Sequence, residues 1–513
     1  MLADSVTNRA AKSGAVLFYG LVALLVFAPL YWGGNRPLPL LVMELAALVL
    51  LVGLAWKGSR SVQPAVLSWP VRIFLVALFL LPLLQLLPAP LAFWADLPGR
   101  EFYAGALRLA GAGDAGFDWR AISLVSSSTE ATWLALLPPL ATFVVASFLS
   151  GRRLLVLAQV FLGIAVGQAL LGLIQYGDGA DSAFRFGSTL MKGSASGTYV
   201  NRNHLAGLLE MALPVALALL AATVGHGAPR YSGHGRRKRT LRQWLARFSV
   251  NRINQATLYG AAALAILLGL VFTRSRSGVS LAMLGILLCT ALFSTRLGGR
   301  NAYGLMGTFT AVGVGLAGLI GLTPVWSRFA YSDPIENGRW RIFDATLQAA
   351  GEFFPLGSGG GTFEDVLRRF HPADFLGVTI NHAHNDYLEW LLEFGLAAAV
   401  LIVVWLVFYL RQWVRVWKRG EWAPLRFVQA GAGIALLLMM LHTLVDFNLR
   451  IPANAMFTAL LAAVFFHRPV EEERQSTRQR REPSGVGDRG ESANALAPAY
   501  EIPPENRTNP FSS

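Results

Sequence analysis

Long apolar runs are the feature that most constrains this chain. A helix needs roughly 20 predominantly apolar residues to cross a bilayer. Twelve stretches approach or meet that length, near 15–32, 38–56, 71–88, 131–149, 154–175, 204–224, 256–272, 278–294, 302–322, 387–410, 427–445 and 454–467. Only 14% of the residues are charged, against roughly 25% in soluble proteins. We therefore expect an all-α polytopic integral membrane protein with about twelve transmembrane helices.

The first apolar run follows a short polar arm with Arg9 and Lys12, which is also the polarity of a signal peptide. No small-x-small cleavage site follows this run, and the next one begins near Leu38. We expect an uncleaved first helix. The single cysteine, Cys289, lies within an apolar run and excludes both a disulfide and a thiolate metal cage.

Lysine and arginine are distributed unevenly between the two sides of this topology. Segments on the side of the N-terminus hold 29 of the 44 basic residues, and the opposite side holds 15. Because cytoplasmic loops are enriched in Lys and Arg, both termini are predicted to be cytoplasmic. The net charge of +14 then reflects topology and the contact with membrane lipids, and we expect no nucleic-acid partner.

A polar segment with two histidines runs directly into one of the apolar stretches. Asp386 and Glu389 have the spacing of a capping box, which predicts a helix start at Asp386 and leaves His382 and His384 just outside it. The positive end of a helix dipole disfavours imidazolium, so a neutral histidine there can accept a proton. The same end attracts anions such as phosphate. The topology places this segment on the outer side, which in a bacterium is the periplasm.

Arginines recur at membrane edges on the histidine side. Arg274 and Arg276 lie in a loop too short to leave the headgroup region, and Arg339 lies in the large outer loop 323–386. Lipid-phosphate anchoring explains the first two equally simply, and a structural salt bridge explains Arg339. Together, however, such planar and permanently charged groups suit a clamp for phosphate or pyrophosphate.

Several separated motifs resemble the bacterial O-antigen ligase and O-antigen polymerase family, over roughly residues 197–462. They are Asn201 to Gly207 (Asn-Arg-Asn-His-Leu-Ala-Gly), the Thr-x-Ser-Arg-x-Gly turn of Thr273, Ser275, Arg276 and Gly278, Gly338 and Arg339 before the Pro-Leu-Gly-x-Gly-x-Gly-x-Phe segment 355–363, and His384, Asn385, Leu388 and Gly395. His442 with Asp446 resembles a late pattern of the family. As an ordered set, these motifs are specific.

The resemblance implies a polytopic glycosyltransferase of the bacterial inner membrane with a periplasmic active site. It would move a glycan from undecaprenyl pyrophosphate to an acceptor hydroxyl, without a metal, nucleotide or other cofactor. His384 maps onto the proposed general base, and Arg276 and Arg339 map onto pyrophosphate clamps. Because a second arginine lies two positions from each, at Arg274 and Arg341, either clamp assignment can shift by two residues.

Supporting roles fall on residues of the same motifs, namely Asn385, His382, Asn203, His204, His442 and Asp446. The implied domains are N-terminal transmembrane helices with a periplasmic loop (1–196), a ligase-like transmembrane catalytic region with the periplasmic loop 323–386 (197–467), and a disordered cytoplasmic tail (468–513). The tail is polar and has no apolar periodicity.

Other interpretations of these residues stay open. His371, His382, His384 and Asp386 could ligate a metal, although no third ligand has a diagnostic spacing. The glycines at 357–361 lack the ending of a P-loop. His442 and Asp446 could form a proton relay or a structural pair.

A transporter or flippase of lipid-linked oligosaccharide is the alternative class of function. Such a protein should carry charges deep within its spans, where only Glu44 and Glu210 clearly fall in this sequence. The acceptor also stays open between lipid A core, a second lipid-linked glycan and a protein hydroxyl.

The topology predicts opposite compartments for two loops. A reporter fused at Gly235 should report the cytoplasm and one at Asp374 the periplasm, because the charge bias places these loops on opposite sides. Paired phosphatase and fluorescent-protein fusions at both positions measure this. Matching signals at the two positions would contradict the topology.

Overall fold

The computed structural model describes residues 2–61, 67–111, 119–185, 193–225, 250–297, 334–375, 377–418 and 422–468, with the isolated residues 307 and 315. Met1–Arg468 form one compact unit. Its long helices are α1 (Leu2–Phe27), α2 (Pro37–Ser61), α3 (Trp69–Gln85), α6 (Ser126–Ala135), α7 (Leu137–Ser147), α8 (Gly151–Gly177), α9 (Arg202–Gly225), α11 (Val250–Phe272), α12 (Arg276–Leu297), α15 (Pro334–Phe353), α17 (Asp386–Lys418), α18 (Pro424–His442) and α19 (Pro452–Phe466).

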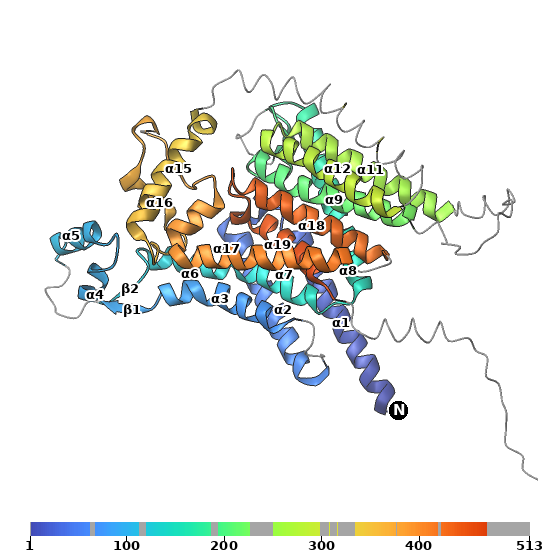
Figure 1. Ribbon diagram of the computed structural model, residues 1–513, viewed down its shortest axis with the longest axis horizontal. Helices are drawn as coiled ribbons and strands as arrows, with labels where there is room; N and C mark the ends of the chain where they lie inside the picture. Colours follow the sequence, from blue (N-terminus) through green and yellow to red (C-terminus); the bar gives the residue numbers. More distant parts are fainter. Residues whose placement is uncertain are drawn as a thin grey trace, which may run out of the picture. The chain divides into compact units, whose positions relative to one another are not determined.

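Short elements connect these helices. They are η1 (Trp32–Gly34), α4 (Leu91–Ala95), α5 (Glu101–Leu109), η2 (Ala183–Arg185), α16 (Phe363–Leu367), η4 (Arg368–Phe370), η5 (Ala373–Phe375) and η6 (Asn448–Arg450), together with the strands β1 (Pro88–Pro90) and β2 (Trp119–Ala121). In the ribbon, α15 and α16 lie beside the outer end of α17 (Figure 1).

The expectation of an all-α polytopic membrane protein is confirmed. Among the described residues, eight helical segments are long and apolar enough to span a membrane, and three shorter apolar helices accompany them. These eleven segments correspond to eleven of the twelve predicted spans. The twelfth predicted span, 302–322, lies outside the described residues.

Helix α9 is the centre of the helical core. Residues 202–222 of this helix are all buried inside the protein. It packs against α8, α11, α12 and α18, and α9, α11, α12 and α18 lie side by side (Figure 1). Polar side chains in this part of α9 are therefore largely enclosed by other helices.

The segment 89–130 combines short helices with a small sheet. It contains α4 and α5, but also a two-stranded antiparallel sheet in which Ala89 of β1 pairs with Arg120 of β2. Two of the three residues of β1 are prolines, which cannot donate to a ladder, so the local sequence does not favour a strand. The sheet forms because the chain around it continues the pairing, with the amide of Ser123 donating to Gln85 O at 2.8 Å.

Helix α17 is interrupted at Gly395, where φ is 57° and ψ is −135°. The glycine-rich segment that follows α15 forms hydrogen bonds with the backbone groups that this break leaves without a partner in the helix. The amides of Ser358 and Gly359 donate to the carbonyls of Leu392 and Glu393 at 2.9 and 3.0 Å, and the amide of Leu396 donates to Pro355 O at 2.8 Å. The Pro-Leu-Gly motif therefore fixes the outer end of α17.

Side chains from the outer segment 85–123 complete this junction. Gln85 Nε2 donates to Glu393 O at 2.8 Å, and Gln85 Oε1 accepts from the amide of Gly360 at 3.0 Å. The buried guanidinium of Arg100 donates to the carbonyls of Gly357 and Ile122 at 3.2 and 2.8 Å. The first two turns of α17 are thus held by three segments far apart in the sequence.

Replacing Gly395 with alanine should destabilise the protein by more than about 2 kcal/mol, because the left-handed φ and the contact are both unfavourable for a side chain. A Cβ at this position would lie 2.1 Å from Pro355 O. The measurement is the Tm of the purified protein in detergent. Gly167→Ala in α8, whose Cβ would meet nothing within 4 Å, is the matched control and should leave the Tm unchanged or slightly raised. Equal Tm values for the two variants would contradict this account of the break.

Candidate functional site

The segment before α17 places two histidines at the outer end of that helix. The helix begins at Asp386, as predicted, but the capping box is wrong. Asn385 is the capping residue, since its Oδ1 accepts from the amides of Tyr387 and Leu388 at 3.0 and 3.1 Å. The Asp386 carboxylate instead accepts from the amide of Leu449 at 3.1 Å. His384 lies just outside the helix in a left-handed backbone conformation, with φ 52°.

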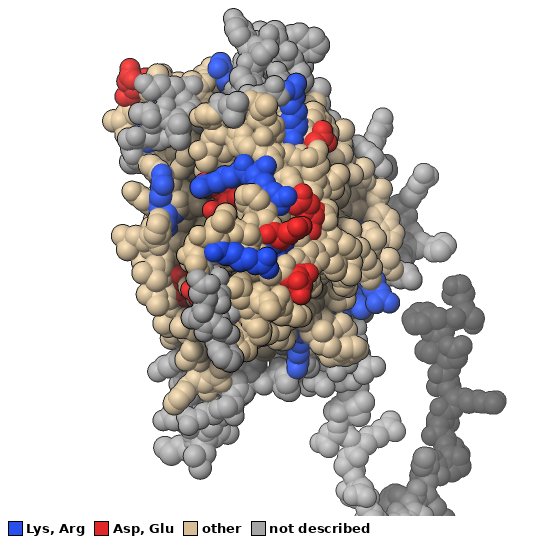
Figure 2. All heavy atoms as spheres, turned by 90° about the vertical axis from the view of Figure 1, so that its left-hand side faces the viewer, with Lys and Arg blue, Asp and Glu red and all other residues tan. Residues whose placement is uncertain are grey.

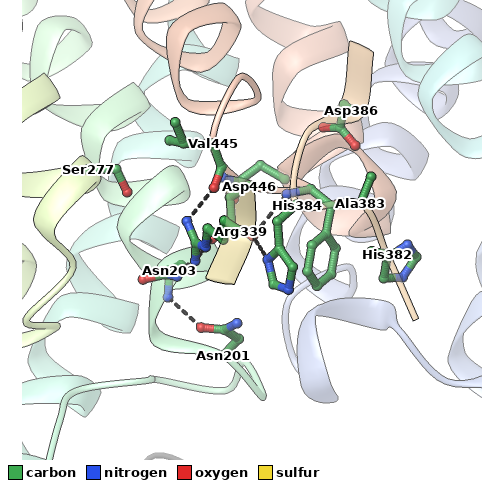
Figure 3. A network of polar contacts seen from close by, with 12 residues as sticks. Asn201, Asn203, Ser277, Arg339, His382, Ala383, His384, Asp386, Val445 and Asp446 are labelled. Atoms are coloured by element: carbon green, nitrogen blue, oxygen red, sulfur yellow. Dashed lines mark hydrogen bonds and ion pairs between the residues drawn. The ribbon is translucent and has the colours of Figure 1, made fainter. Parts of the chain in front are cut away.

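Asp446, between α18 and η6, is the centre of a polar cluster (Figure 3). Its carboxylate oxygens lie 3.3 Å from Nδ1 of His384, 2.7 Å from the donating Nδ2 of Asn203, and 3.7 Å from a guanidinium nitrogen of Arg339. Arg339 also donates to the carbonyl of Val445. In Figure 3, Arg339 and His384 approach Asp446 from opposite sides. The fold therefore joins one residue from each of α9, α15, the segment before α17 and the segment after α18.

The electrostatics of this cluster favour an ionised carboxylate. Asp446 is fully buried. Burial alone would raise the pKa of Asp446, but the hydrogen bond to His384 and the charge of Arg339 outweigh it and hold the pKa well below its ordinary value. The side chain of His384 is 17% exposed. With Nδ1 bonded to the carboxylate, Nε2 is the ring atom available to accept a proton.

His382 belongs to a second cluster on the same segment. Its Nδ1 lies 2.9 Å from Glu389 Oε1, and Glu389 also accepts from the amide of Ala383 at 2.8 Å. Arg450 of η6 pairs with Glu389 at 3.3 Å and with Glu393. The carboxylates of α17 therefore tie the histidine segment to η6.

The ring of Phe447 lies between three histidines. Its centroid is 4.2 Å from that of His382 in a stacked arrangement, and 4.8 and 5.0 Å from those of His204 and His384 in edge-on arrangements. His204, whose carbonyl accepts from Asn454 at 3.0 Å, is buried. The histidines of two motifs thus meet at one aromatic residue.

His442 does not bond to the side chain of Asp446 as the suggested pair would require. Its Nδ1 lies 2.9 Å from Glu210 Oε2 on α9, and its Nε2 lies 2.9 Å from Ser277 Oγ on α12. The two residues are connected through the backbone instead, since the amide of Asp446 donates to His442 O at 3.0 Å.

The four arginines of interest occupy different places. Arg339 is in the Asp446 cluster, while Arg341, two residues further along α15, is exposed. Arg276 is the first residue of α12, next to Ser277. Arg274 lies over the ring of Tyr176 of α8, 5.6 Å from its centroid. The structure thus separates the members of each pair.

The face that includes α15 carries basic and acidic side chains side by side near its middle (Figure 2).

The residues considered as metal ligands do not form one group. His371 makes close contacts with the carbonyls of Pro372 and Val378, at 3.1 and 3.0 Å. Over the part of the chain that the structure describes, no three His, Cys, Asp or Glu side chains are grouped as a metal site would require.

Five residues of the clusters were not predicted from the sequence, namely Glu389, Glu393, Arg450, Phe447 and Ser277. Glu389 was interpreted as a local cap, although its contacts reach η6. Arg450 could have been found from the sequence, because it lies at the edge of an apolar run, as the other arginines of interest do. Glu210 was noted within an apolar run, but its partner on α18 is 232 residues away, beyond the reach of local patterns.

The depressed pKa of Asp446 predicts a pH-dependent contribution to stability. Since its folded-state pKa lies below the unfolded value, the contribution is complete above about pH 3.9 and is lost as the pH falls through the folded value. Asp446→Asn should therefore lower the Tm clearly at about pH 7, and the gap to the parent protein should narrow below about pH 4. Asp344→Asn, at an exposed position of α15, is the control and should change little. A gap of constant width across this pH range would contradict an ionised Asp446.

A comparison with known protein families gives one match. Residues 261–403 match the family model described as O-antigen ligase. The matched segment contains Arg276, Arg339 and His384, whereas Asn203 and Asp446 lie outside it. No curated protein matches the chain significantly. Over this segment the chain is therefore similar to the O-antigen ligase family.

Proposed function

We propose that this protein transfers a glycan from undecaprenyl pyrophosphate to an acceptor hydroxyl at the periplasmic face of the bacterial inner membrane. It would act as an O-antigen ligase or a surface-polysaccharide polymerase. The observation that carries the proposal is the pairing of His384 with a buried, ionised Asp446 beside Arg339. This pairing supports a base next to a cation at the N-terminal end of α17.

The reaction needs one proton removed from the acceptor hydroxyl and one pyrophosphate released. Nε2 of His384 takes the proton as the hydroxyl oxygen forms its bond to the anomeric carbon. The carbon–oxygen bond to pyrophosphate breaks, and the electron pair leaves with the phosphate. Asp446 orients the ring and stabilises the imidazolium that forms, as the carboxylate does in a Ser-His-Asp triad. Such general base catalysis contributes typically ~10²- to 10⁴-fold.

Arginines neutralise the departing pyrophosphate in this mechanism. Arg339 is adjacent to the base through Asp446, and Arg276 opens α12, where the helix dipole also favours an anion. Of each sequence pair, these two are the better assignments. Arg341 is exposed, and Arg274 lies on the ring of Tyr176. A planar guanidinium with several donors matches a phosphate better than an ammonium does.

A membrane-side groove supports a lipid-linked substrate. A cavity of about 780 Å³ is lined almost entirely by apolar side chains of α3, α7, α17, α18 and α19. Its outer end includes Tyr387 and Leu388, three and four residues after His384. An apolar surface of this size suits a polyprenyl or acyl chain while the head of the lipid lies at the histidines.

Deletion in the host tests the reaction and identifies the acceptor. Polymer lost from lipid A with intact carrier-linked chains indicates ligation to lipid A core. Accumulation of single carrier-linked repeats indicates polymerisation onto a second lipid-linked glycan. Loss of outward exposure of the carrier-linked glycan would instead support a transporter, the alternative class.

His384→Ala should abolish transfer while leaving the carrier-linked donor bound, because the change removes a base and leaves the arginines in place. The loss is expected to be roughly 10²- to 10⁴-fold. His382→Ala is the matched control and should be milder, since the ring of His382 is stacked on Phe447 and bonded to Glu389. Transfer and donor retention are both measured on purified, folded protein. The base assignment fails if His382→Ala is the more damaging change.

A further inference from the structure

A continuous polar chain crosses the apolar helical core. Glu210 of α9 contacts one ring nitrogen of His442 on α18, and the other ring nitrogen contacts Ser277 of α12, each at 2.9 Å. Glu210 and His442 are fully buried. Three helices are therefore joined by one carboxyl, one imidazole and one hydroxyl.

This chain is a costly way to stabilise a membrane-spanning core. Buried polar and ionisable groups lose solvation, and apolar residues of similar volume are often equally stabilising. A fully bonded chain instead specifies one relative placement of the helices that carry it. What it specifies here is the position of the first turn of α12.

The turn before α12 depends on that contact. Within the turn the hydrogen bonds are local. Ser275 N donates to the Thr273 hydroxyl at 3.2 Å, and Gly278 N donates to the Ser275 hydroxyl at 3.3 Å. Arg274 has a φ of 56°, which side chains rarely adopt. The Ser277–His442 contact joins residues 165 positions apart and ties this turn to the end of α18.

The other end of the same connection leads to the proposed base. His442 is the last residue of α18, and Asp446 follows it within one turn, bonded to its carbonyl at 3.0 Å. Asp446 holds both His384 and Arg339. The end of α18 thus fixes the acid–base pair on one side and the turn with Arg276 on the other.

We propose that Glu210, His442 and Ser277 are positioning residues that hold Arg276 in register with His384 for the pyrophosphate of the donor. The inference rests on the proposed function and extends it to residues that do not touch the substrate. The chain acts through Arg276, so its loss affects use of the donor and leaves use of the acceptor intact.

Ser277→Ala tests the end of the chain nearest to Arg276. The kcat/KM for the carrier-linked donor should fall roughly three- to tenfold, the size of one lost hydrogen bond, while the KM for the acceptor stays unchanged. Ser277→Thr keeps the hydroxyl and should restore the donor kcat/KM. Ser280→Ala, at an exposed position of the same helix, is the matched control and should behave as the parent protein.

A double-mutant cycle separates positioning of Arg276 from a general structural role. In an Arg276→Lys background, which loses the planar fork, Ser277→Ala should cause no further loss of donor kcat/KM. Effects that multiply in the double variant would overturn the inference. A parent protein without any glycan transfer would overturn the proposed function and this inference together.

The far end of the chain provides an independent pair of variants. Glu210→Gln keeps an oxygen that accepts from His442 Nδ1 and should retain donor kcat/KM. Glu210→Leu removes that oxygen and should lower donor kcat/KM as Ser277→Ala does. Equal donor kcat/KM in folded preparations of these two variants would overturn the inference.

Discussion

The buried carboxylate of Asp446 is the interaction on which the arrangement of the site depends. A carboxylate in a fully buried position must be paired, because an isolated charge in such surroundings is strongly unfavourable. Asp446 meets this requirement with His384, Arg339 and Asn203. Each partner comes from a different segment of the chain. Pairing this one charge therefore fixes the relative positions of four segments, including the one that carries Asp446. The site geometry is therefore a consequence of burying this group.

The interruption of α17 extends that constraint to the outer segments. In a continuous helix, the backbone groups would form hydrogen bonds with one another and need no other partner. The break at Gly395 leaves carbonyls without a partner in the helix, and they accept hydrogen bonds from the Pro-Leu-Gly segment. Arg100 then links this segment to the chain around β2. The glycines of this motif thus have a structural role, and the phosphate-cradling role that a glycine run suggests is not needed to explain them.

The helices and the location of the site could be predicted from the sequence, because both depend on local properties. Apolar runs of bilayer length define spans, and a histidine next to such a run lies at its end. The partners could not be predicted, because they depend on which helices become neighbours. Glu389 shows the difference. Its spacing from Asp386 fits a cap, yet Asn385 makes the cap and Glu389 pairs with His382 and Arg450.

The same limit applies to the two short strands. Ala89 and Arg120 pair only because α3 ends and α6 begins beside each other, and nothing in a three-residue segment with two prolines favours a strand. His442 and Asp446 were associated by their spacing, but α18 ends at His442 and Asp446 lies beyond it. Their side chains bond in different directions, to Glu210 and Ser277 in one case and to His384 in the other. In this case the spacing of two residues predicts neither a shared helix nor a shared partner.

In the mechanism proposed above, the charges of the Asp446 cluster would favour release of pyrophosphate. With a neutral His384, the charges of Asp446 and Arg339 cancel. Taking the acceptor proton makes the cluster positive at the moment when the leaving pyrophosphate gains negative charge. The positive charge of the cluster and the negative charge of the pyrophosphate would stabilise each other, because electrostatic interactions are weakly screened in a partly buried site. In that proposed mechanism, the electrostatics of one buried carboxylate and its two basic partners would couple proton uptake to departure of the leaving group.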